Sequence, residues 1–530
     1  MLHVIFVLPP NLGRFGAIGI PTGVLVLASL AERAGHTTDF WLASDSRESC
    51  PRDLVYRPSE DGLGPLLILH EFTRGLEGKI QAALDGGRRP VLAISCFSSA
   101  LYLSTTLVAA RVRHRFPDLP VMVGGTHPTI DPGSLLEVVG VRAGALASPE
   151  LGAAAAPAFV AELTAATEAI EQRGDFVFDL LFRGRAERSF VEALAELGAR
   201  RPAEPRVIEA RPLEEPAGFR LSCDVLSRLA GPGTAGTAVR RFDLCFSFGC
   251  PFDCRFCINS TRHERWRGID VEHAVEVLEH LHLRHGVAGF SVIDANFGTS
   301  APWRRRFFEL VARKPWASEI EIDIETSVLT FDLPDYSILD GFGLTLQVGV
   351  ESCSDRMLIG MNKTKSPERY KRKLARLVRV AAPHVDLVGL MLIFGYPGET
   401  RETLAQTLAF LLDDCDVLAH PNVVLVPQLY VPLMGTEAAN RTDLDRAEHG
   451  FEPDPPAWWL TATSPPVGGS RPSRDLSIED CARFAAPIWD YYFGDARVGS
   501  RGERPAITVK TKLQKRRLRA RLEEALAGPR

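Results

Sequence analysis

The chain has 530 residues, of which 45% are hydrophobic and 24% charged, and its formal net charge is −5. This length suggests several domains, and the composition is typical of globular proteins rather than disordered or fibrous ones. A chain with a negative net charge does not attract the phosphate backbone of a nucleic acid, so we expect no nucleic-acid partner.

The N-terminal region has neither the pattern of a membrane span nor that of a signal peptide. Its most apolar stretch, residues 17–31, is interrupted by Pro21 and is shorter than the roughly 20 residues that a spanning helix needs. No basic residues precede a short apolar core with a small-residue cleavage site. We therefore expect a cytoplasmic protein with no membrane partner.

Residues 1–205 alternate short apolar runs with helical patterns. The runs typical of buried strands are residues 2–8, 91–97, 120–125 and 175–184. Strands separated by helices pair in parallel, so this region is predicted to be a doubly wound, Rossmann-like α/β domain. No glycine motif of the GxGxxG type follows the first strand, which argues against a dinucleotide ligand.

Sheets of this kind bind ligands in the crevice beyond the carboxyl ends of their strands. Glycines at these ends allow a bulky ligand to approach the backbone, and small serines leave room and donors. The candidate binding residues at the strand ends are Asn11, Ser95, Ser98, Ser99, Gly124, Gly125, Thr126, His127 and Gly184.

Two segments interrupt this pattern. An alanine-rich stretch, about residues 144–170, is interpreted as a surface helical insert. Residues 206–236 are rich in Pro, Gly, Glu and Ala and are predicted to be a partly ordered linker.

A second and more regular alternation occupies residues 237–431. Its strand candidates are residues 241–249, 289–296, 319–327, 344–352, 385–395 and 422–431. Six strand–helix repeats are fewer than a complete eight-fold barrel of about 250 residues requires. We therefore predict an open, partial barrel, followed by a C-terminal region, residues 432–530, that caps the substrate. For the basic tail at residues 510–521 we favour a solvated helix over a helix that binds an acidic partner.

Alternation within the strands predicts a polar lumen in this barrel. In EIEIDIET, the acids Glu321, Asp323 and Glu325 share one face of the strand and isoleucines occupy the other. A packed barrel would fill its interior with branched apolar side chains, so we expect the polar faces to line a space for ligands. The alternative is that these acids are solvated edge positions.

Four of the ten cysteines fall within thirteen residues. Cys250, Cys254 and Cys257 follow the first barrel strand on a tight loop, and three thiolates at this spacing can each ligate one iron of a four-iron cluster. The fourth iron then has an open coordination site for a small molecule. Structural zinc is the alternative, but zinc prefers four closed ligands, and Cys245 lies within the strand.

This motif, CxxxCxxC with Phe256 before the last cysteine, resembles the signature of the radical S-adenosylmethionine superfamily. Other segments agree in order: IDANFG with Asp294, VGVES with Glu351, GMNKT at 360–364, and FGYPGET with Gly395 and Tyr396. The resemblance implies a [4Fe–4S] cluster and S-adenosylmethionine as cofactors. It also implies that Glu351 contacts the ribose and that the 394–400 turn packs near the adenine.

The first domain resembles the cobalamin-binding branch of that superfamily. The motifs are a Pro-Pro pair at 9–10, Gly-His at 35–36, SxxSS at 95–99 and GGTHP at 124–128. The DxHxxG string that supplies an axial histidine in other cobalamin enzymes is absent. His127 is expected to shape the pocket for the nucleotide tail or to make ordinary turn hydrogen bonds. Where many relatives have an acidic GEGE string, only Gly184 and Glu187 fit.

The resemblance implies a methyltransferase that acts on an unactivated carbon of a small molecule. Methylcobalamin would supply the methyl group, a 5′-deoxyadenosyl radical would activate the substrate, and a flavodoxin or ferredoxin would supply electrons. The alternatives are a cyclase or rearrangement enzyme with the same cofactors, and a cobalamin or redox sensor. The substrate is expected near Gln428, Tyr430 or Trp458–Trp459, where core aromatics are an equally good interpretation.

Overall fold

The structure is a computed structural model in which the chain divides into two compact units. The first comprises Met1–Glu215, Arg220–Ala238 and Ala457–Ser464, and the second Pro216–Phe219, Val239–Pro456 and Pro465–Arg530. Within them, the structure describes residues 1–11, 22–43, 55–56, 65–98, 101–136, 157–197, 201–214, 219–230, 240–262, 264–453, 471–493 and 512–527.

The first unit contains a seven-stranded sheet with the order β3-β2-β1-β4-β5-β6-β7, in which every pair of neighbours is parallel. The strands are β1 (His3–Leu8), β2 (Thr37–Ala43), β3 (Val55–Tyr56), β4 (Pro90–Ser95), β5 (Val121–Gly124), β6 (Leu180–Arg183) and β7 (Arg206–Glu209). All six residues of β1 are buried, as expected for a central strand covered on both faces. The predicted doubly wound α/β fold is confirmed.

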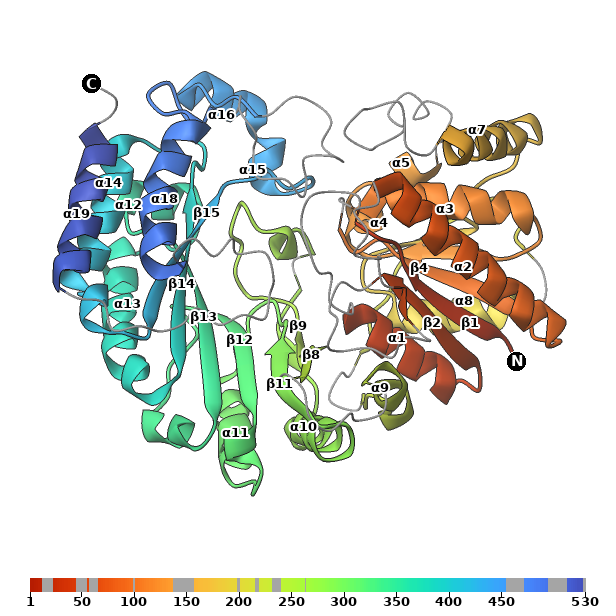
Figure 1. Cartoon of the computed structure of the whole chain (residues 1–530), viewed down its shortest axis with the longest axis horizontal. Coiled ribbons are helices and arrows are strands. Elements are labelled where there is room, and N and C mark those ends of the chain that lie inside the picture. Colours follow the sequence, from red (N-terminus) through yellow and green to blue (C-terminus); the bar gives the residue numbers. More distant parts are fainter. Residues whose placement is uncertain are drawn as a thin grey trace. The chain divides into compact units, whose positions relative to one another are not determined.

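Helices connect these strands and pack on one another (Figure 1). They are α1 (Thr22–Arg33), α2 (Pro65–Asp85), α3 (Tyr102–Arg115), α4 (Thr126–Ile130), α5 (Gly133–Leu136), α7 (Pro157–Gln172), α8 (Glu187–Leu197) and α9 (Cys223–Ala230). Helix α1 contacts α8 and α9, and α3 contacts α2 and α7.

One interpretation of the sequence needs correction here. Residues 206–209, assigned to a linker, form the edge strand β7, and residues 223–230 of the same stretch form α9. The helix predicted in the alanine-rich segment is α7, which lies at the surface, buries Phe159, Leu163 and Ala166 on one face, contacts α3 and exposes its other face. The part of that segment before residue 157 lies outside the described residues.

The second unit contains a six-stranded sheet with the order β15-β14-β13-β12-β11-β8, again with every pair parallel. Its strands are β8 (Arg240–Leu244), β11 (Val287–Val292), β12 (Glu321–Ser327), β13 (Gly343–Glu351), β14 (Leu387–Phe394) and β15 (Val423–Leu429). Each strand pairs with the next in the chain, and β8 and β15 are the two edges among the described residues. This is the arrangement predicted for a partial barrel.

Helices lie between these strands, and several of them begin at a residue whose side chain caps the helix. They are α10 (Val271–His285), α11 (Ala301–Ala312), the 3-10 helix η8 (Tyr336–Gly341), α12 (Asp355–Gly360), α13 (Pro367–Ala381) and α14 (Arg401–Ala409). The Asp270 side chain accepts a hydrogen bond from the backbone of His273 at the start of α10, and Gly286 ends that helix in the left-handed conformation. Thr400 and Thr403 form a capping box on α14.

The strands of this sheet alternate as predicted. Ile322 and Ile324 of β12 are fully buried, whereas Glu321, Asp323 and Glu325 are half-buried. The polar side chains bind across strands, because Gln347 Nε2 donates to both carboxylate oxygens of Asp323 at 2.8 and 2.9 Å. Whether this face holds a ligand stays a prediction.

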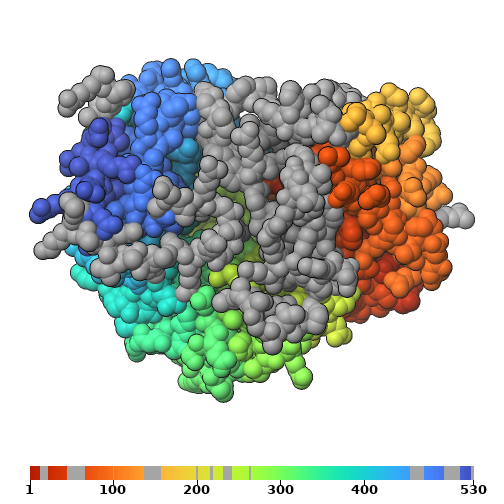
Figure 2. Space-filling view, in the orientation of Figure 1, coloured from red at the N-terminus to blue at the C-terminus, as the bar shows by residue number. Residues whose placement is uncertain are grey.

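The described residues of the C-terminal region are mostly helical and belong to the second unit. It consists of α15 (Glu437–Asn440), α16 (Thr442–His449), α18 (Ile478–Phe493) and α19 (Lys512–Ala527). Figure 2 shows α18 and α19 in blue at the surface. The basic tail is a helix, α19, that buries Leu518 and Leu522, and its Arg521 pairs with Asp490 of α18 at 2.7 Å. No helix among the described residues is long and apolar enough to cross a membrane.

Candidate functional site

The three-cysteine loop begins after a short strand, β9 (Ser247–Phe248), that pairs antiparallel with β10 (Arg267–Gly268). Gly249 turns the chain with φ of 78°, and a Cβ atom there would lie 2.5 Å from the Arg265 carbonyl oxygen. The next residue, Cys250, donates its backbone N–H to the Glu264 carbonyl at 3.1 Å. Only glycine fits this turn, because both the conformation and the close approach exclude a side chain.

Beyond Cys250 the loop closes on itself. The Cys257 N–H donates to the Cys254 carbonyl at 3.0 Å, and Ser260 Oγ lies 2.9 and 2.6 Å from the carbonyl oxygens of Cys254 and Cys257. Burial raises the pKa of the Cys254 thiol to about 11. The three predicted ligands thus lie within eight residues of one loop, with Cys254 buried and Cys250 and Cys257 half-buried.

Asp294, predicted to bind S-adenosylmethionine, has its carboxylate bound inside the protein. It is 1% exposed and accepts hydrogen bonds from the backbones of Phe246 and Ser247 at 2.8 and 3.1 Å and from Ser247 Oγ at 2.5 Å. Trp266 Nε1 donates to the same serine hydroxyl at 2.8 Å. Burial raises the pKa of Asp294 to about 6, against these hydrogen bonds. Asp294 therefore ties the end of β11 to the chain that enters the cysteine loop.

Glu351 ends β13 in a buried ion pair. It has φ of 64°, and the pairing of β13 with β14 shifts register just before it. Its Oε1 lies 2.8 Å from Lys363 Nζ, and both side chains are less than a tenth exposed. Burial disfavours the ammonium, but the Glu351 carboxylate, together with Tyr370 and Cys254, outweighs it, so the pKa of Lys363 is raised above its ordinary value. Both charges also act on the Cys254 and Cys257 thiols.

The FGYPGET turn is organised by a buried acid that the sequence analysis did not single out. Glu399 is 1% exposed, accepts the Gly395 N–H at 2.9 Å and binds Thr403 Oγ1 at 3.1 Å. Burial raises the pKa of Glu399 to about 7. Gly395 has φ of 88°, and a Cβ there would meet the Ile478 side chain at 3.1 Å.

Of the candidate substrate residues, Gln428 is exposed and Tyr430 is buried. Tyr430 packs edge-on against Tyr396, with ring centroids 5.0 Å apart, in an apolar cluster with Met361 that Phe256 also contacts. Of the two interpretations offered for Tyr430, the structure shows a core aromatic. Trp458 and Trp459 lie outside the described residues.

In the first unit, the predicted cobalamin-binding residues lie at the carboxyl ends of β1, β4, β5 and β6, which are neighbours in the sheet. Gly125 has φ of 123°, and a Cβ there would lie 2.5 Å from the Cys96 backbone. Thr129 Oγ1 accepts the Gly184 N–H at 3.0 Å and so joins the ends of β5 and β6. Ser99 lies outside the described residues. Seven other members of the set are half-buried: Asn11, Ser95, Ser98, Gly124, Gly125, Thr126 and Gly184.

His127 does not point to solvent. It is fully buried, its Nε2 lies 3.0 Å from Ser134 Oγ, and its ring lies 4.7 Å from that of Tyr102. Burial lowers the pKa of His127 to about 4, so the ring is neutral at physiological pH. These contacts agree with ordinary hydrogen bonding in the turn.

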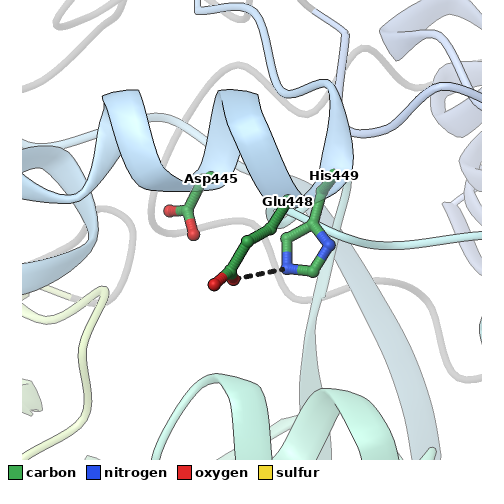
Figure 3. A group of neighbouring side chains, drawn as sticks. All are labelled: Asp445, Glu448 and His449. Atoms are coloured by element: carbon green, nitrogen blue, oxygen red, sulfur yellow. Dashed lines mark ion pairs between the residues drawn. The ribbon is translucent and has the colours of Figure 1, made fainter.

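One group of metal-ligand types occurs on α16, where Asp445, Glu448 and His449 have ligand atoms within 4.8 Å of one another (Figure 3). Arg441 Nη2 lies 3.7 Å from the Asp445 carboxylate and 4.0 Å from that of Glu448. His449 Nε2 also lies 3.7 Å from the Glu448 carboxylate, so the group is explained as an ion-pair network.

Comparison with known proteins places the second unit in a family. Residues 244–411 match the model of the Radical SAM superfamily. An uncharacterized methyltransferase of Pyrococcus horikoshii is 29% identical over 167 residues, which are 31% of this chain and 35% of that protein. The match thus spans about a third of the relative's length. The chain contains a radical SAM domain, with the three cysteines inside it.

Two solved structures share the fold over both units. The cobalamin-dependent S-adenosylmethionine radical enzyme OxsB, solved with aqua-cobalamin and S-adenosylmethionine bound, matches with a TM-score of 0.54 and 13% identity over 99% of this chain and 71% of its own. The radical S-adenosylmethionine methyltransferase TsrM from Kitasatospora setae matches with a TM-score of 0.50 and 15% identity over 94% and 87%.

The first prediction concerns Asp294. Asp294→Ala leaves two backbone N–H groups and the Ser247 hydroxyl with no acceptor, each at a cost of about 1–3 kcal/mol. We expect a lower free energy of unfolding in urea and less bound iron after anaerobic reconstitution. Asp294→Asn, which keeps an acceptor oxygen, is the control and should lose much less stability and much less iron. Equal behaviour of the two variants would contradict this role.

The second prediction is a pH dependence from Glu399. Its pKa is about 7 in the folded state against 4.5 ordinarily, so the folded protein holds the proton more tightly. The free energy of unfolding therefore falls as pH rises from 4.5 to 7, by an amount on the order of 3 kcal/mol. Urea unfolding of wild type and Glu399→Gln across this range should show that the free energy of unfolding of the variant rises relative to that of wild type. Glu402→Gln, at an exposed position of α14, is the control. Parallel curves for wild type and Glu399→Gln would refute the assignment.

Proposed function

We propose that this chain is a cobalamin-dependent radical S-adenosylmethionine enzyme. The observation that carries the proposal is the loop of Cys250, Cys254 and Cys257 in the radical SAM domain, beside the buried carboxylate of Glu351. A sensor would not need a nucleoside-binding carboxylate, so an enzyme is the better explanation.

The residues present fit an iron–sulfur cluster. Thiolates are the usual ligands of such clusters, and three on one short loop leave one iron for an exogenous ligand. Cys245 is the nearest other cysteine in the sequence. Its thiol donates a hydrogen bond to the Ser247 carbonyl at 3.0 Å, so this thiol already has a partner within the protein. When bound, the cluster would supply the electron that cleaves S-adenosylmethionine, and a flavodoxin or ferredoxin would reduce it.

The chain's own groups would hold and orient S-adenosylmethionine. Glu351 would accept hydrogen bonds from the ribose hydroxyls, and the Lys363 ammonium, 2.8 Å away, holds this carboxylate in place. Phe256, only partly buried, and the turn at Gly395 and Tyr396 would face the adenine. Asp294 would act indirectly, since its carboxylate is already bound by Phe246 and Ser247.

The carboxyl edge of the first sheet fits a bulky planar ligand. Gly124 and Gly125 present backbone without side chains, and Ser95 and Ser98 are small and half-buried. Cobalamin bound there would supply the methyl group. Because His127 is buried against Ser134, it is not available to ligate cobalt, and we propose that the lower face has no ligand from this residue.

The reaction that we propose is methylation of an unactivated carbon of a small molecule. The methyltransferase names of the relative and of TsrM support this outcome over a cyclisation or rearrangement with the same cofactors. The protein would contribute positioning and exclusion of water. The half-buried polar face of β12 and β13 and the exposed Gln428 are the proposed substrate contacts.

The third prediction tests the cluster. Cys254→Ala removes one of the three ligands, so we expect it to lose most of its iron and all formation of 5′-deoxyadenosine. Iron and sulfide analysis and chromatography of the reaction products measure both. Cys223→Ala, an exposed cysteine of the first unit, is the control and should behave as wild type. A full cluster with undiminished cleavage in Cys254→Ala would show that the ligand assignment is wrong.

The fourth prediction separates methylation from rearrangement. Reconstituted enzyme supplied with cobalamin and S-adenosylmethionine labelled with deuterium in its methyl group should give a product heavier than its substrate by one labelled methyl group. Mass spectrometry of the product provides the measurement. A product of the same mass as the substrate, with 5′-deoxyadenosine formed, would instead indicate a rearrangement.

A further inference from the structure

The segment from Gly360 to Lys363 contacts both the cysteine loop and the carboxylate proposed to bind the ribose. It begins at Gly360, the last residue of α12, and its Lys363 makes the ion pair with Glu351. On the other side it binds the backbone of the loop between the cluster cysteines at two residues, Asp253 and Arg255. A stretch of four residues thus bridges two parts of one site.

The conformation of this segment follows from how α12 ends. Asn362 has φ of 51°, in the left-handed region, and its N–H donates to the Ile359 carbonyl at 3.0 Å. The Lys363 N–H then donates to the Leu358 carbonyl at 2.9 Å. Asparagine adopts this conformation more readily than other residues with a side chain. The turn sends Lys363 toward Glu351 and leaves the last carbonyls of the helix for other donors.

Arg255 supplies those donors from the middle of the cysteine loop. Its Nη1 donates to the Gly360 carbonyl at 2.9 Å, and its backbone N–H donates to the Met361 carbonyl at 3.0 Å. A cation at the C-terminus of a helix is also electrostatically favourable. The residue between Cys254 and Phe256 is therefore held by both its backbone and its side chain.

Asn362 adds a bond of its own to the same loop. Its Nδ2 donates to the Asp253 carbonyl at 2.7 Å, one residue before Cys254. The loop is held from a second side by the start of α15, because the Ala438 N–H donates to the Arg255 carbonyl at 2.9 Å and Glu437 pairs with Arg255 Nε at 2.7 Å. Segment 360–363 differs from the start of α15 in that it also binds Glu351, through Lys363.

We propose that residues 360–363 are a positioning segment that fixes the separation between the cysteine loop and Glu351, with Asn362 as its key residue. The inference rests on the proposed function, because that separation matters only if one ligand reaches both places. S-adenosylmethionine would do so, with its amino and carboxylate groups at the open iron and its ribose at Glu351. A displacement of about 1 Å in such a site can cost on the order of a hundredfold in rate.

The test compares Asn362→Gly with wild-type, full-length protein reconstituted anaerobically. Glycine adopts the left-handed turn but lacks the amide that binds Asp253, so the helix end is kept and one contact to the loop is lost. We expect wild-type iron content, an unchanged electron paramagnetic resonance spectrum of the reduced cluster, and a dissociation constant for S-adenosylmethionine raised about five- to tenfold. The turnover number for 5′-deoxyadenosine formation should fall as well.

Asp416→Gly is the matched control, since Asp416 is exposed and also has a positive φ, of 44°. It should match wild type in every measurement. Wild-type affinity and turnover in Asn362→Gly would overturn the proposal, and so would a loss of affinity in proportion to a loss of iron, which would indicate only a weakened loop. If wild-type protein with a full cluster binds no S-adenosylmethionine, the proposed function itself fails.

Discussion

The candidate site depends on the requirement that buried polar groups find partners. The cysteine loop is not part of a helix or a sheet, so its backbone is bound by distant segments: Glu264 at its start, Asn362 and Met361 at its middle, and Ala438 opposite them. Glu264 precedes β10, whereas Met361 and Asn362 follow β13 and Ala438 follows β15. The segments after β13 and β15 reach the loop because the parallel sheet brings the carboxyl ends of its strands to one edge. Three sulfurs are consequently placed by the fold of the whole domain.

The same requirement explains the buried acids around the loop. Asp294, after β11, accepts backbone N–H groups of the segment after β8, and Glu399 accepts one of the turn after β14. Glu351 pairs with Lys363 after β13. Each acid costs free energy to bury and repays it by fixing a turn in one conformation. The turns that follow these three strands of one sheet are thereby kept rigid, as a site for a reactive ligand requires. The first unit uses glycine and threonine instead, at Gly125 and Thr129.

Much of this architecture could be predicted from the sequence. Both parallel sheets, the strands of the second unit and the cysteine loop follow from apolar periodicity and from residue spacing. Strands β2 and β7 could not be recognised, because β2 mixes polar and apolar residues and β7 is short and mostly exposed. Contacts such as those of Arg255 and Asn362 join positions about a hundred residues apart, and no local pattern marks them. Asp294 was predicted to bind S-adenosylmethionine, and only the fold reveals its partners within the protein, which are two backbone N–H groups and the Ser247 hydroxyl.

The central claim is that three cysteines hold a cluster whose fourth iron binds S-adenosylmethionine directly. Electron–nuclear double resonance on the reduced cluster tests it most directly, with S-adenosylmethionine carrying nitrogen-15 in its amino group. The account predicts a hyperfine coupling from that nitrogen, which disappears when unlabelled compound is used. A spectrum without such coupling from protein that holds a full cluster, or protein that binds zinc in place of iron, would contradict it.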